Sequence, residues 1–269
     1  MTRPFGKQLR VVFGETVTEL GARDPRVVVL DGDLGSSTQA RLFEDAYPER
    51  YYQMGIAEQN MLGVAAGMAK AGLVPFISTF VAFALHRPLD QIRVLIAQTG
   101  ANVKITAGYC GLFTGKAGKT HQIVDDISIA RAMPGMVVIS PADEVEAKEV
   151  MAWSLEYEGP VFIRFVRDVT QTLFEPGHRF QFGKVKVVRE GSDITLSSTG
   201  TQTPRVVDAA DSLAAAGVDA HVEHMPTIKP IDVAGVVEAA EKTGRVVTIE
   251  EHTVIGGLGG AVAETLSEH

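Results

Sequence analysis

A single carboxylate stands at the start of a segment that otherwise carries no charge. Glu58 is followed by Gln59 and Asn60, and every residue from 61 to 69 is Met, Leu, Gly, Val or Ala. A helix that is apolar on all sides is expected to be buried, and a buried carboxylate needs a partner or a proton. Glu58 is therefore either an acid placed at a helix N-terminus by the helix dipole or a group that exchanges a proton in catalysis.

Three further stretches carry side chains that could do chemistry. Phe80 and Phe83 are spaced to share one face of a helix, where such a pair usually belongs to the core. His121 ends a glycine-rich stretch, and its pKa near neutrality suits proton transfer. Arg164 and Arg167 end a strand-like run, and open parallel sheets bind ligands beyond the carboxyl ends of their strands. Each signal is weak alone, and the order of the stretches along the chain makes them strong.

Alternating β-rich runs and helical stretches indicate a parallel α/β architecture. In the first unit we expect strands at 26–31, 73–78, 102–107, 136–141 and 160–165, and helices at 15–22, 58–71, 80–93, 124–133 and 143–157. In a smaller second unit we expect strands at 193–199, 218–225 and 245–251, and helices at 203–216, 232–242 and after 256–260. The glycine-rich stretch 108–122 is long for a loop in a compact domain, and such loops are often functional.

The predicted fold class is α/β, with two parallel-sheet units. We place the first domain at 1–170, a linker or short antiparallel excursion at 171–190 and the second domain at 191–269. Two glycine-rich stretches are set aside as binding motifs. The stretch 256–260 lacks the acidic residue expected about 20 residues after a dinucleotide loop. The stretch 31–37 reads Asp-Gly-Asp where a diphosphate-metal motif has Gly-Asp-Gly, so we place no metal ligand in this chain.

Composition describes a soluble protein with a well-developed core. The net charge of −8 argues against nucleic acid or an anionic membrane as a partner. The one cysteine, Cys110, leaves no intrachain disulfide and fits a reducing compartment. No signal-peptide pattern is visible, and no apolar run reaches the roughly 18 residues of a membrane span. We therefore expect a cytoplasmic protein.

Taken in order, the motifs resemble the C-terminal half of transketolase. They are "GIAEQN", "STFVAF" with "RPLDQIR", "GKAGKTHQIVDDISIARAMPGMVVISPADEVEA" and "GPVFIRFVR", and together they span almost the whole chain. Deoxyxylulose-phosphate synthase is a close relative with similar motifs. The resemblance implies a pyrimidine-binding domain followed by a transketolase C-terminal domain. It further implies one chain of a split transketolase, which transfers a two-carbon ketol group from a ketose (phosphate) donor to an aldose (phosphate) acceptor.

The resemblance assigns roles to residues on the cofactor side. It implies thiamine diphosphate, and Glu58 matches the glutamate that pairs with N1′ of the aminopyrimidine ring. Glu58 is therefore expected to be catalytic as well as cofactor-binding. The other matched cofactor-binding positions are Phe80, Phe83, Asp33, Ile56 and His86. Phenylalanine rings suit offset stacking on a pyrimidine.

On the substrate side, His121 matches a catalytic histidine close to the reacting oxygens. Arg10, Ser37 and Arg167 match positions that bind a sugar phosphate, and a planar guanidinium suits that task. Tyr109 lies where transketolases often carry a histidine near the substrate, so it is the remaining substrate-side candidate.

Three positions depart from the family pattern. Ala117 replaces an aspartate that reads a substrate hydroxyl, Tyr109 replaces a histidine, and His86 replaces an aromatic residue. Losing a hydroxyl-reading carboxylate should weaken discrimination at that carbon. A ketol or acyl transferase with a non-standard sugar or biosynthetic substrate is therefore an alternative. The β-subunit of a 2-oxo-acid dehydrogenase, a nucleotide-binding module and a non-catalytic partner subunit fit the motifs less well.

The implied site is incomplete without a second chain. The diphosphate-binding domain is missing here, so a complementary N-terminal subunit is expected to hold Mg²⁺ and the diphosphate. Two copies of each chain would form an α2β2 heterotetramer. Similar subunits also run on past the glycine-rich stretch 256–260 for a strand and a further helix, so we expect a shortened or incomplete C-terminal domain.

Overall fold

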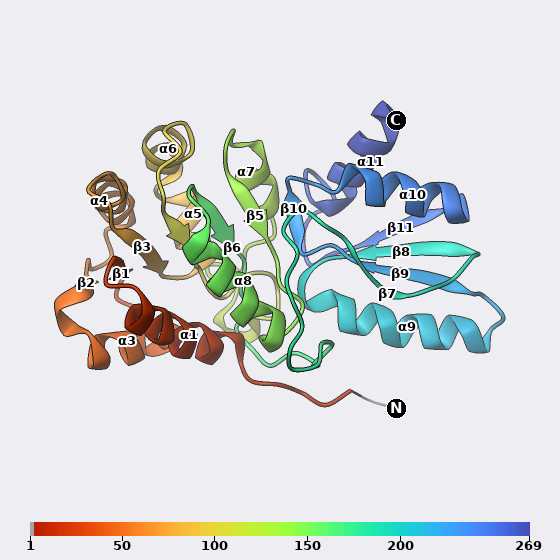
Figure 1. The fold of residues 1–269 in the computed structure, drawn as a ribbon, viewed down its shortest axis with the longest axis horizontal. Coiled ribbons are helices and arrows are strands. Elements are labelled where there is room, and N and C mark those ends of the chain that lie inside the picture. The colour runs from red at the N-terminus through yellow and green to blue at the C-terminus, as the bar shows by residue number, and fades with distance from the viewer. Residues whose placement is uncertain (1–2) are drawn as a thin grey trace.

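Two β-sheets, each with helices packed on it, lie next to one another along the long axis of the molecule (Figure 1). The computed structural model describes residues 3–269. The predicted α/β class with two parallel-sheet units is confirmed. One antiparallel strand joins the parallel strands of each sheet.

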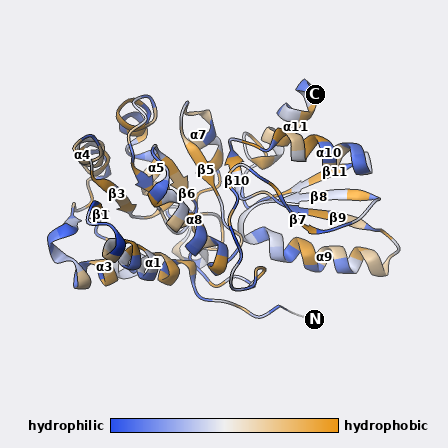
Figure 2. Cartoon of the chain, in the orientation of Figure 1, coloured by the Kyte–Doolittle hydropathy of each residue, from blue (hydrophilic) through white to orange (hydrophobic). Residues whose placement is uncertain are grey.

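Within the described residues, the first sheet has seven strands in the order β10-β5-β6-β4-β3-β1-β2. They are β1 (Val27–Asp31), β2 (Tyr51–Gln53), β3 (Val74–Ser78), β4 (Lys104–Ile105), β5 (Val137–Ile139), β6 (Val161–Ile163) and β10 (Thr227–Lys229). Strands β1 and β3 are buried at all five positions because helices cover both faces of the sheet. Figure 2 shows the matching hydrophobic colouring of these central strands.

The helices of the first unit form two layers. On one face, α1 (Leu9–Arg23) packs with α3 (Arg41–Ala46) and α8 (Glu144–Glu156). On the other, α4 (Glu58–Lys70) packs with α6 (Leu89–Gln91) and a π-helical turn at Ile92–Ala97. The other α-helices of this unit are α2 (Gly35–Thr38), α5 (Val81–His86) and α7 (Asp126–Ala132). None of the helices between residues 3 and 269 is long and apolar enough to cross a membrane.

The second sheet has the order β11-β8-β9-β7. Its strands are β7 (Lys186–Arg189), β8 (Ile194–Ser198), β9 (Ala220–His224) and β11 (Val246–Ile249), and its helices are α9 (Thr203–Ala215), α10 (Val233–Thr243) and α11 (Leu258–Glu268). Strand β7 pairs antiparallel with β9, within the excursion expected before residue 190. Strand β10 leaves this unit and pairs antiparallel with β5, so the second part of the chain extends the first sheet.

Two expected elements are shorter than their sequence patterns suggest. The strand expected at 102–107 forms a ladder only at Lys104–Ile105. The helix expected at 80–93 is divided, because Phe80 is extended and Pro88 separates α5 from α6. Proline cannot donate the backbone hydrogen bond that a continuous helix needs.

Helix α4 departs from the expectation that an apolar helix is buried on every side. Its inner face is buried through Glu58, Met61, Leu62, Ala65 and Ala66. On its outer face Gly67 is exposed, and Gly63, Val64 and Met68 are half-buried. Val64 and Met68 pack partly against the core, so the apolar surface that remains open lies around Gly67 and the half-buried Gly63.

Candidate active site

Glu58 lies in the first turn of α4 with its carboxylate turned inward. The chain enters the helix through a tight turn at Gly55, whose φ of 69° favours glycine. Only 3% of the Glu58 side chain is exposed, and Arg87 Nη1 donates to Glu58 Oε1 at 2.6 Å. The buried carboxylate therefore has the partner that burial demands.

Arg87 connects this carboxylate to an aromatic cluster. Its guanidinium lies 4.1 Å from the centroid of the Phe83 ring, within the range of a cation–π contact. The rings of Phe80 and Phe83 are 5.8 Å apart and nearly parallel. The His121 imidazole faces both rings, at 5.7 Å from Phe80 and 5.3 Å from Phe83. Four predicted site residues, Glu58 included, are thus linked through a residue that the sequence did not single out.

Tyr109 extends the cluster toward the predicted phosphate-binding residues. Its ring stacks on Phe80 at a centroid distance of 3.7 Å. The Tyr109 hydroxyl donates to the Ser37 carbonyl at 3.4 Å, and Arg10 Nη1 donates to the same oxygen at 3.3 Å. The Arg167 guanidinium lies 5.6 Å from the Tyr109 ring. Tyr109 and the three predicted phosphate-binding residues therefore meet at one end of the cluster.

A buried aspartate that the sequence analysis did not assign holds the turn before Ser37. Asp31 ends β1 and is fully buried. Its Oδ2 accepts the N–H groups of Leu34 at 2.9 Å and Gly35 at 3.0 Å, and Oδ1 accepts Ser78 Oγ at 2.9 Å. The first acid of the stretch 31–37 is thus engaged in shaping the turn that presents Ser37.

Asp33 and Ile56 lie on two neighbouring exposed turns. Gln53 Oε1 accepts the N–H of Asp33 at 3.1 Å and the N–H of Gly55 at 2.9 Å, which ties the two turns together. The Ile56 side chain is 72% exposed. Both residues lie outside the aromatic cluster, on the two turns that the Gln53 side chain joins.

His86 also lies apart from the aromatic rings. It is exposed at the end of α5, and its Nε2 lies 3.2 Å from both carboxylate oxygens of Asp125. The ring contacts recorded for residues 3–269 join His121, and not His86, to Phe80 and Phe83. The structure thus separates His86 from the other aromatic positions.

Arg164, which its place after a strand suggested as a ligand-binding residue, has a structural role instead. Its Nε donates to Asp126 Oδ2 at 2.5 Å and its Nη2 to the Glu251 carbonyl at 2.6 Å. Both charged side chains of the pair are buried. Although burial opposes the charge, Asp126 raises the pKa of Arg164. The strand position was informative, but Arg167 is the arginine that turns to the cluster.

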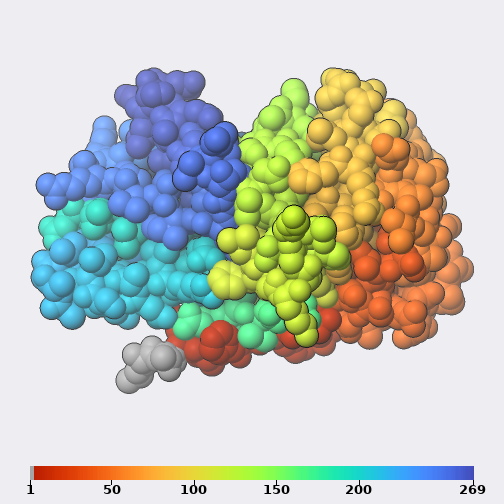
Figure 3. All heavy atoms as spheres, turned by 180° about the vertical axis from the view of Figure 1, so that it is seen from behind, coloured from red at the N-terminus to blue at the C-terminus, as the bar shows by residue number. Residues whose placement is uncertain are grey.

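The loop 108–122 forms the surface next to these residues. Figure 3 shows it in yellow-green, between the orange and red segments of the first unit and the blue segments of the second. Phe80 N-caps α5 and forms a bridge with Gly108, so the loop begins directly beside the aromatic cluster.

The arrangement brings together three chemical features. A buried carboxylate can share a proton, flat rings can stack on a heteroaromatic ligand, and two arginines can bind an anion. Arg87 already stands as a planar cation between the carboxylate and a ring. The site therefore suits a flat, protonated heterocycle next to an anionic substrate.

Two family models match nearly the whole chain. The family model described as "Transketolase, pyrimidine binding domain" matches residues 6–172. The model described as "Transketolase, C-terminal domain" matches residues 183–269. The first match contains every predicted site residue.

Individual proteins give the same result. A putative transketolase C-terminal section of Methanocaldococcus jannaschii is 43% identical over 267 residues, covering 98% of this chain and 83% of that protein. A 6-deoxy-6-sulfo-D-fructose transketolase subunit of Clostridium sp. (strain MSTE9) is 38% identical, covering 100% and 85%. A solved structure described as a split gene transketolase, inactive β4 tetramer, superposes with a TM-score of 0.91 at 44% identity, covering 98% of this chain and 86% of that one.

Proposed function

The chain belongs to the transketolase family, and on this premise we propose that it is the C-terminal subunit of a split, thiamine-dependent transketolase. The proposed reaction transfers a two-carbon ketol group from a ketose (phosphate) donor to an aldose (phosphate) acceptor. The observation that supports it best is the buried Glu58 carboxylate, linked by a stacked planar cation to Phe83 and so to Phe80 and His121.

The residues present fit the aminopyrimidine half of thiamine diphosphate. Arg87 hydrogen-bonds to Glu58 and stacks on Phe83. An aminopyrimidine ring offers the same two properties, a flat face and a ring nitrogen that can share a proton with a carboxylate. When bound, thiamine diphosphate supplies the electron sink that stabilises the two-carbon carbanion.

The residues of this chain divide the remaining tasks. Glu58 holds a proton at the N1′ position, and Phe80 and Phe83 fix the plane of the ring. His121, next to both rings, exchanges a proton with the substrate oxygens. Arg10 and Arg167 bind the anionic group of the substrate at the far end of the cluster.

A partner chain completes the site. We assign the diphosphate and Mg²⁺ to a complementary N-terminal subunit and propose two copies of each chain. Asp33 and the exposed Ile56 would then border the cofactor at the contact between chains. Within this subunit, we propose a pyrimidine-binding domain at 1–170, a linker at 171–190 and a C-terminal domain at 191–269.

The substrate end favours a sugar that differs from the common pentose phosphates. Tyr109 fills the space beside Phe80, and Ala117 places a methyl group in the loop where the family pattern has a carboxylate. The 38% identical relative is described as a 6-deoxy-6-sulfo-D-fructose transketolase subunit, and this description of a related chain supports a sulfonated or otherwise unusual sugar as a candidate. A non-standard ketose is therefore the second candidate substrate class.

The deciding experiment is calorimetric titration of thiamine diphosphate with Mg²⁺. It is done first with this chain alone and then with a candidate diphosphate-binding subunit. We expect binding only in the mixture, followed by turnover in a screen of ketose phosphates and a sulfonated ketose. Tight binding to this chain alone would place the diphosphate and the metal here and reject the split site.

The role of Glu58 is tested in the same mixture. Glu58→Gln keeps the side-chain volume and should lower kcat by at least about 100-fold, since positioned proton transfer contributes that much or more. Glu241→Gln, on the exposed side of α10, is the control and should leave kcat unchanged. Full activity of Glu58→Gln would mean that Glu58 is not the proton partner of the cofactor.

A further inference from the structure

A carboxylate from the second unit holds the loop that carries Tyr109 and His121. Glu251 follows β11 and is only 8% exposed. Its Oε1 accepts the N–H of Leu112 at 2.5 Å and the N–H of Phe113 at 2.9 Å. Charge-assisted hydrogen bonds of this kind are stronger than neutral ones.

The loop is shaped to receive this carboxylate. Gly111 has a φ of 70°, and a Cβ at this position would lie 2.3 Å from Glu251 Oε1. Only glycine allows so close an approach. On either side of the contact, Gly111 N–H donates to the Ile123 carbonyl at 3.0 Å and Thr114 Oγ1 to the Tyr109 carbonyl at 2.9 Å. The carboxylate thus sits inside a closed turn that includes Tyr109.

Tyr109 needs such support. Its φ of 66° is unusual for a residue with a side chain, and a conformation of this kind costs about 1–3 kcal/mol, which the surrounding contacts must offset. The same residue stacks on Phe80 and reaches the Ser37 carbonyl. Its strained backbone and its place in the cluster therefore depend on one turn of chain, which Glu251 closes.

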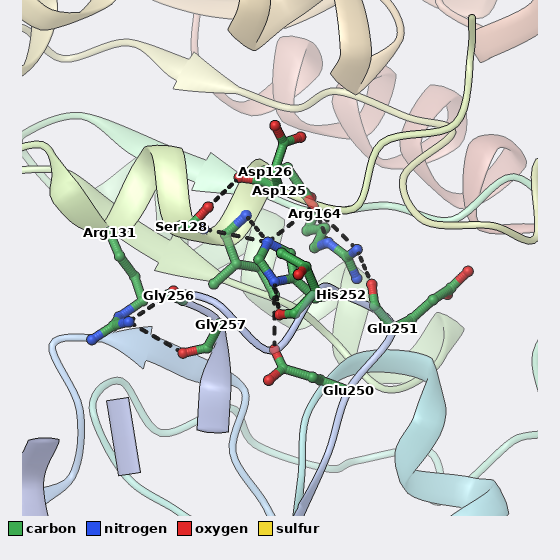
Figure 4. A network of polar contacts seen from close by, with 12 residues as sticks. Asp125, Asp126, Ser128, Arg131, Arg164, Glu250, Glu251, His252, Gly256 and Gly257 are labelled. Atoms are coloured by element: carbon green, nitrogen blue, oxygen red, sulfur yellow. Dashed lines mark hydrogen bonds and ion pairs between the residues drawn. The ribbon is translucent and has the colours of Figure 1, made fainter. Parts of the chain in front are cut away.

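Glu251 is itself fixed by a buried polar network (Figure 4). Arg164 donates to the Glu251 carbonyl and pairs with Asp126 at the start of α7. His252 Nε2 accepts the N–H of Ile127 at 3.1 Å, in the first turn of the same helix. Burial raises the pKa of the Glu251 carboxyl, while the two loop amides and Arg164 oppose this shift.

We propose that Glu251 is a positioning residue of the active site, through which the second unit sets the conformation of loop 108–122 and the placement of Tyr109 and His121. Glu251 lies outside the aromatic cluster and acts through the backbone of Leu112 and Phe113. The inference deepens the proposed function and rests on it only for its kinetic readout.

The structural arm of the test is hydrogen exchange on the chain. Glu251→Ala removes the acceptor and should speed exchange of the 108–122 peptides by at least about tenfold. Glu251→Gln keeps an acceptor oxygen and should retain most of the protection. Glu250→Ala is the matched control, because Glu250 accepts the N–H groups of Leu258 at 2.7 Å and Gly259 at 2.9 Å at the start of α11.

The kinetic arm uses the complex reconstituted with its partner. Glu251→Ala should raise KM for the ketose about tenfold and also lower kcat, because the loop carries both Tyr109 and the proton-exchanging His121. Thiamine diphosphate affinity should stay within about twofold. Glu251→Gln should restore KM. Unchanged exchange in Glu251→Ala, or equal losses in the Glu250 and Glu251 variants, would overturn the inference. If the complex shows no transketolase turnover, the proposed function fails. The hydrogen-exchange result still decides whether Glu251 holds the loop 108–122 in place.

Discussion

Arg87 and Glu58 hold each other with a contact that a bound aminopyrimidine ring would disturb. The two side chains differ in burial, with 3% of Glu58 and 43% of Arg87 exposed. Solvent screens a pair with one half-exposed member, so we assign it about 1 kcal/mol, well below a fully buried pair. Arg87 is therefore a partner that a ligand can replace.

If Arg87 competes with the cofactor, Arg87→Gln should tighten binding of thiamine diphosphate. The gain should be about fivefold, because about 1 kcal/mol of ion pairing no longer has to be broken. Calorimetric titration of the reconstituted complex measures it. Arg87→Lys keeps the charge without the planar stacking on Phe83, so an intermediate affinity is expected.

Arg93 provides the control for this change. It lies in the π-helical turn that follows α6 and pairs with Asp90 at 2.6 Å, so Arg93→Gln should leave cofactor affinity unaltered. Weaker binding in Arg87→Gln, with Arg93→Gln unchanged, would mean that Arg87 supports the ligand instead of occupying its place.

At the scale of elements, the N-terminus of α8 joins the two units. Asp143 caps the helix, and its Oδ2 also accepts the N–H groups of Leu173 at 2.6 Å and Phe174 at 2.7 Å from the linker. In the first turn of α8, Glu146 Oε2 lies 2.7 Å from Nε2 of His224, at the end of β9. Both members of this pair are buried. One helix end thus carries the linker and the second sheet together.

The pairing of Glu146 with His224 should make the free energy of unfolding depend on pH in the acidic range. Burial disfavours the Glu146 carboxylate, but His224 and further hydrogen bonds outweigh it and lower its pKa to about 2. A carboxyl with a depressed folded-state pKa contributes stability that is complete above its ordinary pKa of 4.5 and is lost as the pH falls toward about 2. The free energy of unfolding should fall over that interval by about 3 kcal/mol, measured by guanidinium titration.

His224→Gln tests the source of this acid dependence. The variant keeps a donor near Glu146 without the imidazole, so we expect lower stability at pH 7 and a shallower loss toward acid. Lys148→Ala breaks an exposed pair with Glu19 and should change stability by less than about 1 kcal/mol. An unaltered pH slope in His224→Gln would assign the acid loss to other carboxyls.

Sequence patterns predicted most elements of the first sheet because its strands are short, apolar and buried on both faces. The run Val27–Asp31 is an example. Strand β10 could not be predicted, because Thr227–Lys229 is three residues long and is a strand only through its antiparallel contact with β5. Tertiary pairing overrides local preference in such short runs.

The same limit applies to the candidate site. Motifs indicated Glu58, Phe80, Phe83 and His121, because their spacing and order are local properties. Arg87 meets Glu58 across 29 residues of chain, and Glu251 meets Leu112 across 139. Contacts between residues so far apart leave no periodic signal in the sequence. The pairing of Arg87 with Glu58 and the contact of Glu251 with the loop 108–122 could therefore be found only in the folded structure.

At the scale of the whole molecule, the outer face of α4 is the feature that points beyond this chain. An all-apolar helix is normally buried, yet here Gly67 is exposed and Gly63, Val64 and Met68 are only half-buried. A Cβ at Gly63 or at Gly67 would meet no other atom within 4 Å. Since the proposed cofactor site at the start of this helix also needs a second chain, we expect the assembly to cover this face.

Gly67→Leu should affect the stability of the free chain and the association of the subunits in opposite directions. In the free chain the leucine fits, and helix stability should rise by up to about 1 kcal/mol because glycine is a poor helix former. In the assembly the same side chain should prevent close packing and weaken association by at least about tenfold. Thermal unfolding of the free chain and sedimentation velocity with the partner subunit measure the two effects. Ala214→Leu, on the exposed face of α9, should alter neither. If Gly67→Leu stabilises the chain and assembles normally, the outer face of α4 faces solvent and the second chain must reach Glu58 from another side.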